Sequence, residues 1–213
     1  MSGKTRVMLV DDHAVVRMGF RMLLEATDDM TVVAEAETGE AAYQSFQDAA
    51  PDVIVMDLAM PGAGGMEAAK RILARDKGAR ILALSAHEDP SHARHMLKAG
   101  ALGYLSKRSA PEALIDAIRQ IAAGRMYVDA IVAQRMAMQE FRGETNPVGL
   151  LSEREFEIFL QLAKGLSVNQ IADILTLSPR TVGTHLYNIK QKLNVSNQAE
   201  IALIAVRHGL IET

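Results

Sequence analysis

The sequence predicts an α/β domain with a doubly wound parallel sheet, followed by a small all-α domain. Three observations support this. Short apolar runs recur through residues 1–123 and alternate with segments of helical length, as strands do with helices. Glycine, proline and asparagine concentrate at residues 142–149, as in a linker. Every later segment has a helical pattern. We therefore predict domains at 1–123 and 150–213, joined by a connector at 124–149.

The expected first domain consists of five strand–helix alternations. The apolar runs predict strands at residues 6–11, 30–36, 53–57, 80–85 and 103–106. The other segments predict helices at residues 14–26, 39–49, 65–75, 90–99 and 110–123. Right-handed crossovers would join these elements into an open sheet, for which the flavodoxin-like strand order 2-1-3-4-5 is one of the two common solutions.

The fifth helix and the segment after it mark the end of the first domain. Apolar residues at helical spacing between Leu114 and Ile121 predict one buried face. Pro111 stands near the first turn, and Gly124 follows the last. Residues 125–141 have a mixed face, which predicts a helical connector.

The second domain is expected to contain four helices. Ser152 and Ser167 each open a pattern typical of a capping box, in which side chains satisfy free backbone amides at the helix start. Ser178 and Pro179 provide an N-cap and a first-turn proline for a third helix. A fourth helix is expected near residues 197–208.

Composition limits the class of protein. Apolar residues make up 49% of the chain and charged residues 23%, as in an ordinary soluble globular protein. The sequence has no cysteine, which excludes disulfides, thiolate catalysis and cysteine-ligated zinc. It has no signal-peptide pattern and no apolar span near the ~20 residues that a membrane helix needs. We therefore expect no membrane association and a cytoplasmic location.

Polar side chains stand where four of the expected strands end. Asp11 and Asp12 follow the first apolar run, and Asp57 ends the third. Ser85 ends the fourth run, and Lys107 follows the fifth. Ligands of open parallel sheets bind beyond the carboxyl ends of the strands. We therefore expect three carboxylates, a hydroxyl and an ammonium to converge on one spot.

This set of groups predicts phosphoryl chemistry. An aspartate carboxylate can attack a phosphoryl group and form an acyl phosphate, while its neighbours position the group and neutralise its charge. Mg²⁺ prefers oxygen ligands, which Asp11, Asp12 and Asp57 can supply. Lys107 and Ser85 would donate charge and hydrogen bonds. Any one acid at a strand end is more simply a turn residue, but the complete set favours a site.

Residues 170–192 have the skeleton of a helix-turn-helix. Apolar positions predict the inner faces of two helices joined by a turn at Thr176, and no acid stands between Asp173 and Glu200. A helix that presents hydroxyls, amides and basic groups can enter the major groove of DNA. The candidate DNA-contacting residues are Arg180, Thr181, Thr184, Tyr187, Asn188, Lys190 and Lys192. The alternative is a plain four-helix interaction module.

The first domain resembles the receiver domain of bacterial two-component response regulators over about residues 5–123. The motifs that carry the resemblance are Asp11–Asp12, Asp57–Gly62, Ser85 and Lys107. The resemblance implies that Asp57 accepts a phosphoryl group from a histidine kinase and that Asp11, Asp12 and Asp57 bind Mg²⁺. It also implies that Lys107 pairs with the phosphoryl group and that Ser85 bonds to it and moves. Tyr104 matches the aromatic switch residue, whose rotamer follows that movement.

The second domain resembles the LuxR-type DNA-binding domain over about residues 149–211. The matching segments are Leu151–Glu155, Gly165–Ser167, Ile171–Ala172, Leu177–Val182, His185 and Lys192–Leu193. The whole chain resembles the NarL/FixJ class of response regulators. Asp11–His13 and Leu105–Arg108 resemble its sugar-phosphate-transport regulator branch. Where the family often has a side chain able to reach DNA, this chain has Gly183.

We therefore predict a transcriptional regulator rather than an enzyme. Phosphorylation of Asp57 would shift a two-state equilibrium through Ser85 and Tyr104 and so release or dimerise the DNA-binding domain. One alternative is a small carboxylate-dependent phosphatase, against which the attached helix-turn-helix argues. Another is an atypical receiver that binds DNA or acts as a scaffold without phosphate, against which the complete set of acids, serine and lysine argues.

Phosphorylation is expected to favour a homodimer on double-stranded DNA. One recognition helix covers one half-site, and joining two of them makes the second contact intramolecular. A symmetric dimer would bind inverted repeats. The face of the expected fourth and fifth helices, which carries Tyr104, is one candidate dimer surface. The face of the first and fifth helices is the other.

Overall fold

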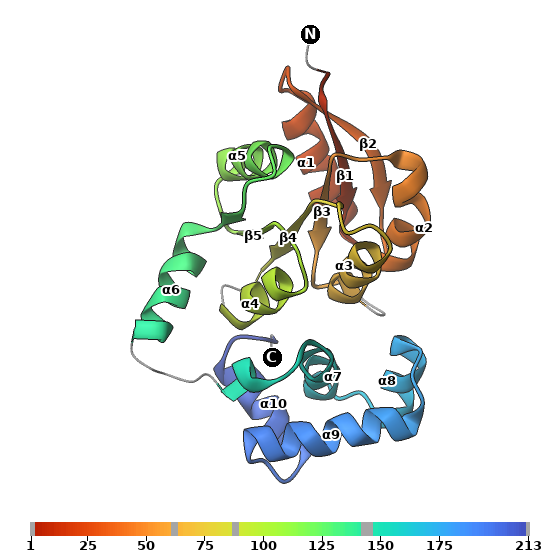
Figure 1. Ribbon diagram of the computed structural model, residues 1–213, viewed down its shortest axis with the longest axis vertical. Helices are drawn as coiled ribbons and strands as arrows, with labels where there is room; N and C mark the ends of the chain where they lie inside the picture. The colour runs from red at the N-terminus through yellow and green to blue at the C-terminus, as the bar shows by residue number, and fades with distance from the viewer. Residues whose placement is uncertain (1–2, 61–63, 87–89, 142–146, 212–213) are drawn as a thin grey trace. The chain divides into compact units, whose positions relative to one another are not determined.

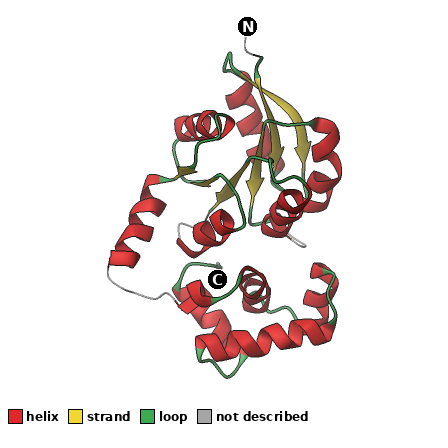
Figure 2. Cartoon of the chain, in the orientation of Figure 1, coloured by secondary structure: helices red, strands yellow, loops and turns green. Residues whose placement is uncertain are grey.

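The computed structural model describes residues 3–60, 64–86, 90–141 and 147–211, and its backbone contacts form two compact units (Figures 1 and 2). One unit is built on a β-sheet and the other on α-helices. Pro61 and Gly62 of the motif after Asp57 lie outside the described residues, as do residues 142–146 of the expected linker. No described helix has both the length and the apolar character needed to span a membrane.

Parallel strands form the sheet of the first unit. They are β1 (Thr5–Val10), β2 (Met30–Ala36), β3 (Val53–Asp57), β4 (Ile81–Ser85), β5 (Gly103–Ser106) and β6 (Tyr127–Val128). Every neighbouring pair is parallel, and the spatial order is β2-β1-β3-β4-β5-β6. The predicted order 2-1-3-4-5 is confirmed, and the sheet has one further strand.

Helices cover both faces of this sheet. The helices that follow its first five strands are α1 (Ala14–Glu25), α2 (Gly39–Ala49), α3 (Gly64–Arg75), α4 (Pro90–Lys98) and α5 (Pro111–Ala122). Helices α1 and α5 share one hydrophobic core with the strands, whereas α2 and α3 pack together on the opposite face (Figure 1). Successive strand residues point to opposite faces, and both faces are buried. The strands therefore stand out in the sequence as continuous apolar runs.

The sixth strand lies in the segment that the sequence predicted as a helical connector. The connector helix α6 (Ala130–Phe141) begins later than expected, because the chain first returns to the edge of β5. Gly124, with φ of 74°, turns the chain after α5. The amide of Tyr127 then donates to the carbonyl of Leu102 at 3.0 Å, and the amide of Asp129 donates to that of Tyr104 at 2.9 Å. These bonds satisfy backbone groups that an edge strand would leave open.

The second unit contains the four helices expected from the cap signals. After a 3₁₀ turn (Pro147–Leu150) they are α7 (Glu153–Ala163), α8 (Val168–Leu175), α9 (Pro179–Leu193) and α10 (Gln198–Arg207). Capping boxes are present at Ser152 and Ser167, and the Ser178 side chain accepts from the amide of Thr181. Asn197 caps the last helix in the same way. The predicted caps are therefore confirmed.

Candidate phosphoacceptor site and DNA-binding surface

The carboxyl ends of the parallel strands bring the predicted polar residues to one edge of the sheet. Asp11 directly follows β1, and Lys107 directly follows β5. Asp57 is the last residue of β3, and Ser85 is the last of β4. Asp11, Asp57 and Ser85 are buried, and the amide of Lys107 donates to the carbonyl of Ser85 at 2.8 Å. The topology thus places carboxylates, a hydroxyl and an ammonium side by side.

Lys107 joins two of the carboxylates. Its Nζ lies 2.6 Å from Asp11 Oδ2 and 2.8 Å from Asp57 Oδ2. The second oxygen of each carboxylate accepts a backbone bond, from the amide of His13 at 2.9 Å for Asp11 and from the amide of Ala59 at 3.0 Å for Asp57. Both carboxylates are therefore held in fixed orientations.

Burial sets the electrostatics of this cluster. It raises the pKa of the Asp57 carboxyl, although the bonds from Lys107 and from the amide of Ala59 act in the opposite direction. Burial also opposes the charged form of Lys107, but its bonds to Asp11 and Asp57 outweigh this and raise the pKa of the ammonium. Lys107 therefore stays charged, and the ionised form of Asp57 is less stable relative to its protonated form than it would be in water.

The acids at this edge fit a divalent cation. Asp11, Asp12, His13 and Asp57 each offer a ligand atom, and these atoms lie within 4.8 Å of one another. Carboxylate oxygens are the ligands that Mg²⁺ prefers. The single positive charge of Lys107 does not balance three carboxylates. A bound cation would therefore neutralise the remaining negative charge. The residues present therefore fit Mg²⁺.

His13 was not among the predicted ligands. Its Nδ1 lies 2.9 Å from Asp12 Oδ1 and 3.3 Å from Asp11 Oδ1, so the ring contacts both carboxylates. Nitrogen is not a preferred ligand of Mg²⁺. The arrangement instead suits a side chain that orients the two acids from the start of α1.

Gly65, at the start of α3, was not among the predicted site residues either. A Cβ built on it would lie 1.7 Å from the carbonyl oxygen of Asp57, which no side chain could tolerate. The first turn of α3 therefore packs directly against the end of the strand that carries Asp57. The paired glycines seven and eight residues after Asp57 were the available signal.

Tyr104 lies in the interior of β5, three residues before Lys107. Its side chain is fully buried in β5, where it pairs with Ala83 of β4 and Val128 of β6. Ser85 ends the same strand as Ala83, so a movement of Ser85 would act on the strand beside Tyr104.

In the second unit, α8 and α9 form a helix-turn-helix. Thr176 ends α8 in the left-handed conformation, with φ of 54°, and Ser178 caps α9 two residues later. Val182, Ile189 and Leu193 are the buried residues of α9. On the opposite side of the helix, Arg180, Thr184 and Tyr187 are exposed in the part of the chain that the structure describes.

The predicted DNA-contacting residues occupy that opposite side and its two edges. Arg180, Thr184, Tyr187 and Asn188 share one face at helical spacing, and Tyr187 is 64% exposed. Thr181 lies at one edge of this face, where its hydroxyl bonds to the Ser178 cap. Among the described residues, no atom lies within 4 Å of a Cβ built on Gly183, so packing there does not demand a glycine.

The two predicted lysines are engaged differently. Lys190 Nζ donates to the backbone carbonyl of Ser196 at 2.8 Å. Because a carbonyl is neutral, this bond does not neutralise the charge of the Lys190 ammonium. Lys192 Nζ donates to Glu155 Oε2 at 2.5 Å. Glu155 is buried and also accepts from the amide of Ser152 at 2.7 Å. Lys192 therefore connects the end of α9 to the start of α7.

The first turn of α7 holds both helices of the motif. Arg154 Nη2 donates to the carbonyl of Leu175 at the end of α8, at 3.1 Å. Its Nη1 donates to Glu157, which is buried. The bond from Arg154 to Leu175 and the Glu155–Lys192 pair therefore connect α8 and α9 to the same turn of α7. Burial opposes the charged form of Glu155, but the bonds from Lys192 and from Ser152 together outweigh it and lower the pKa of the carboxyl.

A parallel α/β unit with an acid–lysine cluster at its strand ends, followed by a helix-turn-helix unit, defines a two-domain DNA-binding regulator. The family model for the response regulator receiver domain matches residues 7–119, and that for bacterial regulatory proteins of the luxR family matches residues 149–205. The chain belongs to the response regulators of two-component signalling, in the NarL/FixJ class. This is a family of transcription regulators rather than of enzymes.

Relatives match along nearly the whole chain. The response regulator UvrY of Escherichia coli strain K12 is 41% identical over 206 residues, which cover 96% of this chain and 94% of UvrY. The response regulator GacA of Pseudomonas viridiflava is 39% identical over 209 residues, which cover 97% of this chain and 98% of GacA. The assignment to the sugar-phosphate-transport branch stays a prediction.

Among solved structures, RcsB from Salmonella enterica serovar Typhimurium, bound to promoter rprA with the phosphomimetic BeF₃⁻, has a TM-score of 0.79 and 25% identity. The match covers 95% of this chain and 98% of that chain. The response regulator ChrA of a heme-sensing two-component system has 38% identity and a TM-score of 0.55, with 99% of this chain and 100% of that chain covered.

The Glu155–Lys192 pair predicts a pH-dependent stability of the second unit. Glu155→Gln keeps a side chain that can complete the capping box but removes the ion pair, and we expect a loss of about 2 kcal/mol at pH 7. Because the folded pKa lies below the ordinary 4.5, the stabilisation is present above pH 4.5 and is lost as pH falls through the folded value.

Denaturation of the full chain at pH 7 and at pH 3 measures this difference. The difference in the free energy of unfolding between wild type and Glu155→Gln should be smaller at pH 3 than at pH 7. Asp173→Asn, at an exposed carboxylate of α8, is the control and should change little at either pH. A gap that is the same at both pH values would contradict the assignment.

Proposed function

We propose that Mg²⁺-dependent phosphorylation of Asp57 by a histidine kinase controls the binding of residues 150–213 to double-stranded DNA. Residues 1–123 would form the receiver and residues 124–149 the connector, and the protein would act in the cytoplasm. The observation that carries the proposal is the position of Lys107 Nζ, within 2.8 Å of Asp57 and closer still to Asp11. A nucleophilic carboxylate, a charge-neutralising lysine and a set of oxygen ligands thus occur together.

The chemistry follows from this arrangement. An oxygen of Asp57 attacks the phosphorus, the bond between phosphorus and the histidine nitrogen of the kinase breaks, and an acyl phosphate forms. Lys107 neutralises charge on the phosphoryl oxygens, and the Ser85 hydroxyl donates to one of them. Asp11, Asp12 and Asp57 would hold Mg²⁺, which supplies further positive charge when bound. Movement of Ser85 would then change the rotamer of Tyr104.

Acetyl phosphate tests the phosphoacceptor directly. With Mg²⁺, intact-mass spectrometry should show one added phosphoryl group on wild type and none on Asp57→Asn, which lacks the nucleophilic oxygen pair. Asp28→Asn, at an exposed acid of the same unit, is the control and should label like wild type.

Full labelling of Asp57→Asn would contradict the assignment. Steady turnover of many equivalents of an unrelated phosphoester would instead favour the phosphatase alternative. DNA binding that is identical with and without the phosphoryl group would favour an atypical, phosphate-independent receiver.

We propose that α9 enters the major groove. The face of Arg180, Thr184, Tyr187 and Asn188 combines a cation, a hydroxyl, a phenol and an amide, which suits base edges and the adjoining backbone. The edges of this face carry Thr181, Lys190 and Lys192. We propose Thr181 and Lys190 as contacts to the DNA backbone, whereas the ammonium of Lys192 is already paired with Glu155. The solved structure of RcsB is of that relative bound to a promoter, which supports the same use of the fold here.

The two lysines should respond differently to salt. Replacing Lys190, whose charge is not neutralised by its contact with Ser196, should weaken binding to all sequences and lower the salt slope by about one unit. Replacing Lys192 should lower the slope much less, because Glu155 already neutralises its ammonium. Titrations of one operator with Lys190→Gln and Lys192→Gln over a series of salt concentrations measure both slopes. Equal reductions of one unit would show that both lysines contact phosphates.

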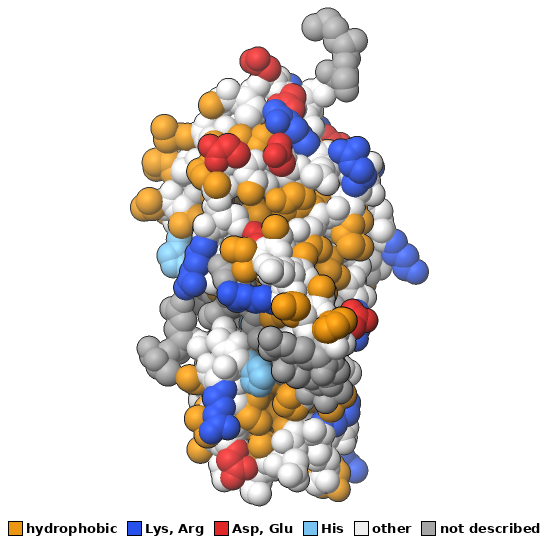
Figure 3. All heavy atoms as spheres, turned by 90° about the vertical axis from the view of Figure 1, so that its left-hand side faces the viewer, with side chains coloured by type: hydrophobic (Ala, Val, Ile, Leu, Met, Phe, Trp, Pro, Cys, Tyr) orange, Lys and Arg blue, Asp and Glu red, His pale blue; other side chains and the backbone are white. Residues whose placement is uncertain are grey.

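We further propose that phosphorylation favours a homodimer through the face of α1 and α5. Val15, Met18 and Met22 form an apolar stripe on α1 and are 83%, 62% and 70% exposed. Figure 3 shows one face of the molecule on which hydrophobic side chains lie at the surface beside charged ones. An exposed stripe at this spacing is typical of a helix that packs against a partner.

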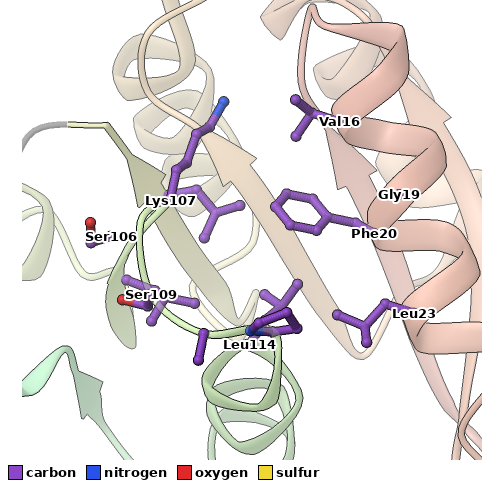
Figure 4. A pocket seen from close by; sticks show the side chains of 12 residues that line it. Val16, Gly19, Phe20, Leu23, Ser106, Lys107, Ser109 and Leu114 are labelled. Atoms are coloured by element: carbon purple, nitrogen blue, oxygen red, sulfur yellow. The ribbon is translucent and has the colours of Figure 1, made fainter.

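A groove of about 540 Å³ between α1 and α5 adjoins the stripe. Phe20 and Leu23 from α1, Leu114 from α5 and Lys107 after β5 are among the residues that line it (Figure 4). The groove therefore reaches from an exposed apolar surface to the segment that carries the phosphoryl-site lysine. This favours α1 and α5 over the fourth and fifth helices as the dimer surface.

Sedimentation velocity with BeF₃⁻ and Mg²⁺ tests the dimer. Wild type should change from monomer to dimer, and Met18→Glu should remain monomeric because it places a charge within the apolar stripe. Met138→Glu, at an exposed methionine of α6, is the matched control and should dimerise. Dimerisation of Met18→Glu, or tighter DNA binding by a protein that stays monomeric, would contradict the proposal.

A further inference from the structure

A guanidinium is buried behind the acidic cluster. Arg17 of α1 is 8% exposed, and its Nη1 donates to the backbone carbonyl of Asp11 at 2.6 Å. Its other donors reach two acids at the end of β2 and just beyond it. Nε lies 3.3 Å from Glu35 Oε2, and Nη2 lies 2.8 Å from Glu37 Oε1. The three donors of one planar group therefore connect the loop after β1 to the end of β2.

The bond to the Asp11 carbonyl bears on both aspartates of the loop. A peptide group is planar, so fixing its oxygen fixes the plane that joins the Cα atoms of Asp11 and Asp12. The amide of Asp11 donates to the carbonyl of Ala36 at 3.1 Å, which holds the preceding peptide against β2. The backbone from which the two carboxylates project is thus held on both sides.

We propose that Arg17 is a positioning residue for the divalent-cation site, and that it acts by orienting the Asp11–Asp12 peptide. This inference rests on the proposed function, which places the cation on Asp11, Asp12 and Asp57. Arg17 itself contacts the carbonyl of Asp11 and not the carboxylates that would bind the ion.

Arg17 orients the Asp11–Asp12 peptide through the geometry of its guanidinium rather than through its charge. Its positive charge is balanced nearby by Glu35 and Glu37, and Arg21 also bonds to Glu35. A lysine at this position would keep the charge, but a single ammonium cannot reproduce a planar fork that reaches a carbonyl and two separate carboxylates. Arg17→Lys therefore separates the two properties.

Calorimetric titration of the full chain with MgCl₂ tests the inference without any phosphorylation. Arg17→Lys should raise the Kd for Mg²⁺ about tenfold, as loss of an outer partner of metal ligands commonly does. Arg21→Lys is the matched control, because Arg21 bonds from the same helix to Glu35 and not, within the described part of the chain, to the Asp11–Asp12 peptide. Its Kd should stay within about twofold of wild type.

The outcomes separate this inference from the proposed function. Wild type and Arg17→Lys that bind Mg²⁺ equally tightly would overturn the role of Arg17 and leave the proposed function intact. A wild type that binds no Mg²⁺ would overturn both. Equal weakening in Arg17→Lys and Arg21→Lys would show a general effect of the charge network and would also overturn the inference.

A second variant applies if circular dichroism shows that Arg17→Lys does not fold. Glu37 is the partner of Arg17 Nη2, and its side chain is 71% exposed. Glu37→Gln therefore weakens one contact of Arg17 and leaves the Asp11 carbonyl and Glu35 in place. We expect weaker Mg²⁺ binding in this variant, with a Kd about threefold above that of wild type and the same thermal unfolding within error. An unchanged Kd would overturn the inference.

Discussion

The first unit depends on one ammonium group that lies between two buried carboxylates. Lys107 Nζ is 2.6 Å from Asp11 and 2.8 Å from Asp57, and both acids are buried, where a carboxylate is costly unless it is paired. The three residues come from the ends of β1, β3 and β5, so the contact exists only because the parallel order places these ends together. In the proposed function, a change in charge at Asp57 would act through Lys107 on the end of β5, the strand that carries Tyr104.

The second unit also contains a buried acid paired with a lysine, and there the pair connects helices. Glu155 is buried at the start of α7, and Lys192 reaches it from the end of α9. Arg154, beside Glu155, bonds to the last carbonyl of α8. One helical turn thus sets the positions of both helices of the DNA-binding motif. In each unit a buried acid paired with a lysine holds together the elements that the proposed function uses. These are the strand ends of the proposed cation site in the first unit and α9 in the second.

Much of this architecture could be predicted from the sequence, because it follows from local patterns. Apolar runs, helix spacing and serine caps are recognised within a few residues, and the strand-end rule then brings the acids and Lys107 together. The remaining features depend on contacts between distant segments. The strand β6 has two residues and forms because the edge of β5 is open. Arg17 and the Glu155–Lys192 pair acquire their roles from partners that no local pattern identifies.

In the proposed function, phosphorylation of Asp57 controls where the protein binds DNA. The most direct measurement is genome-wide occupancy of the wild-type protein and of Asp57→Ala at matched cellular levels, under conditions in which the cognate kinase is active. The account predicts discrete sites for wild type and a marked loss of occupancy at those sites for the variant. Equal occupancy of the same sites by both proteins would contradict it.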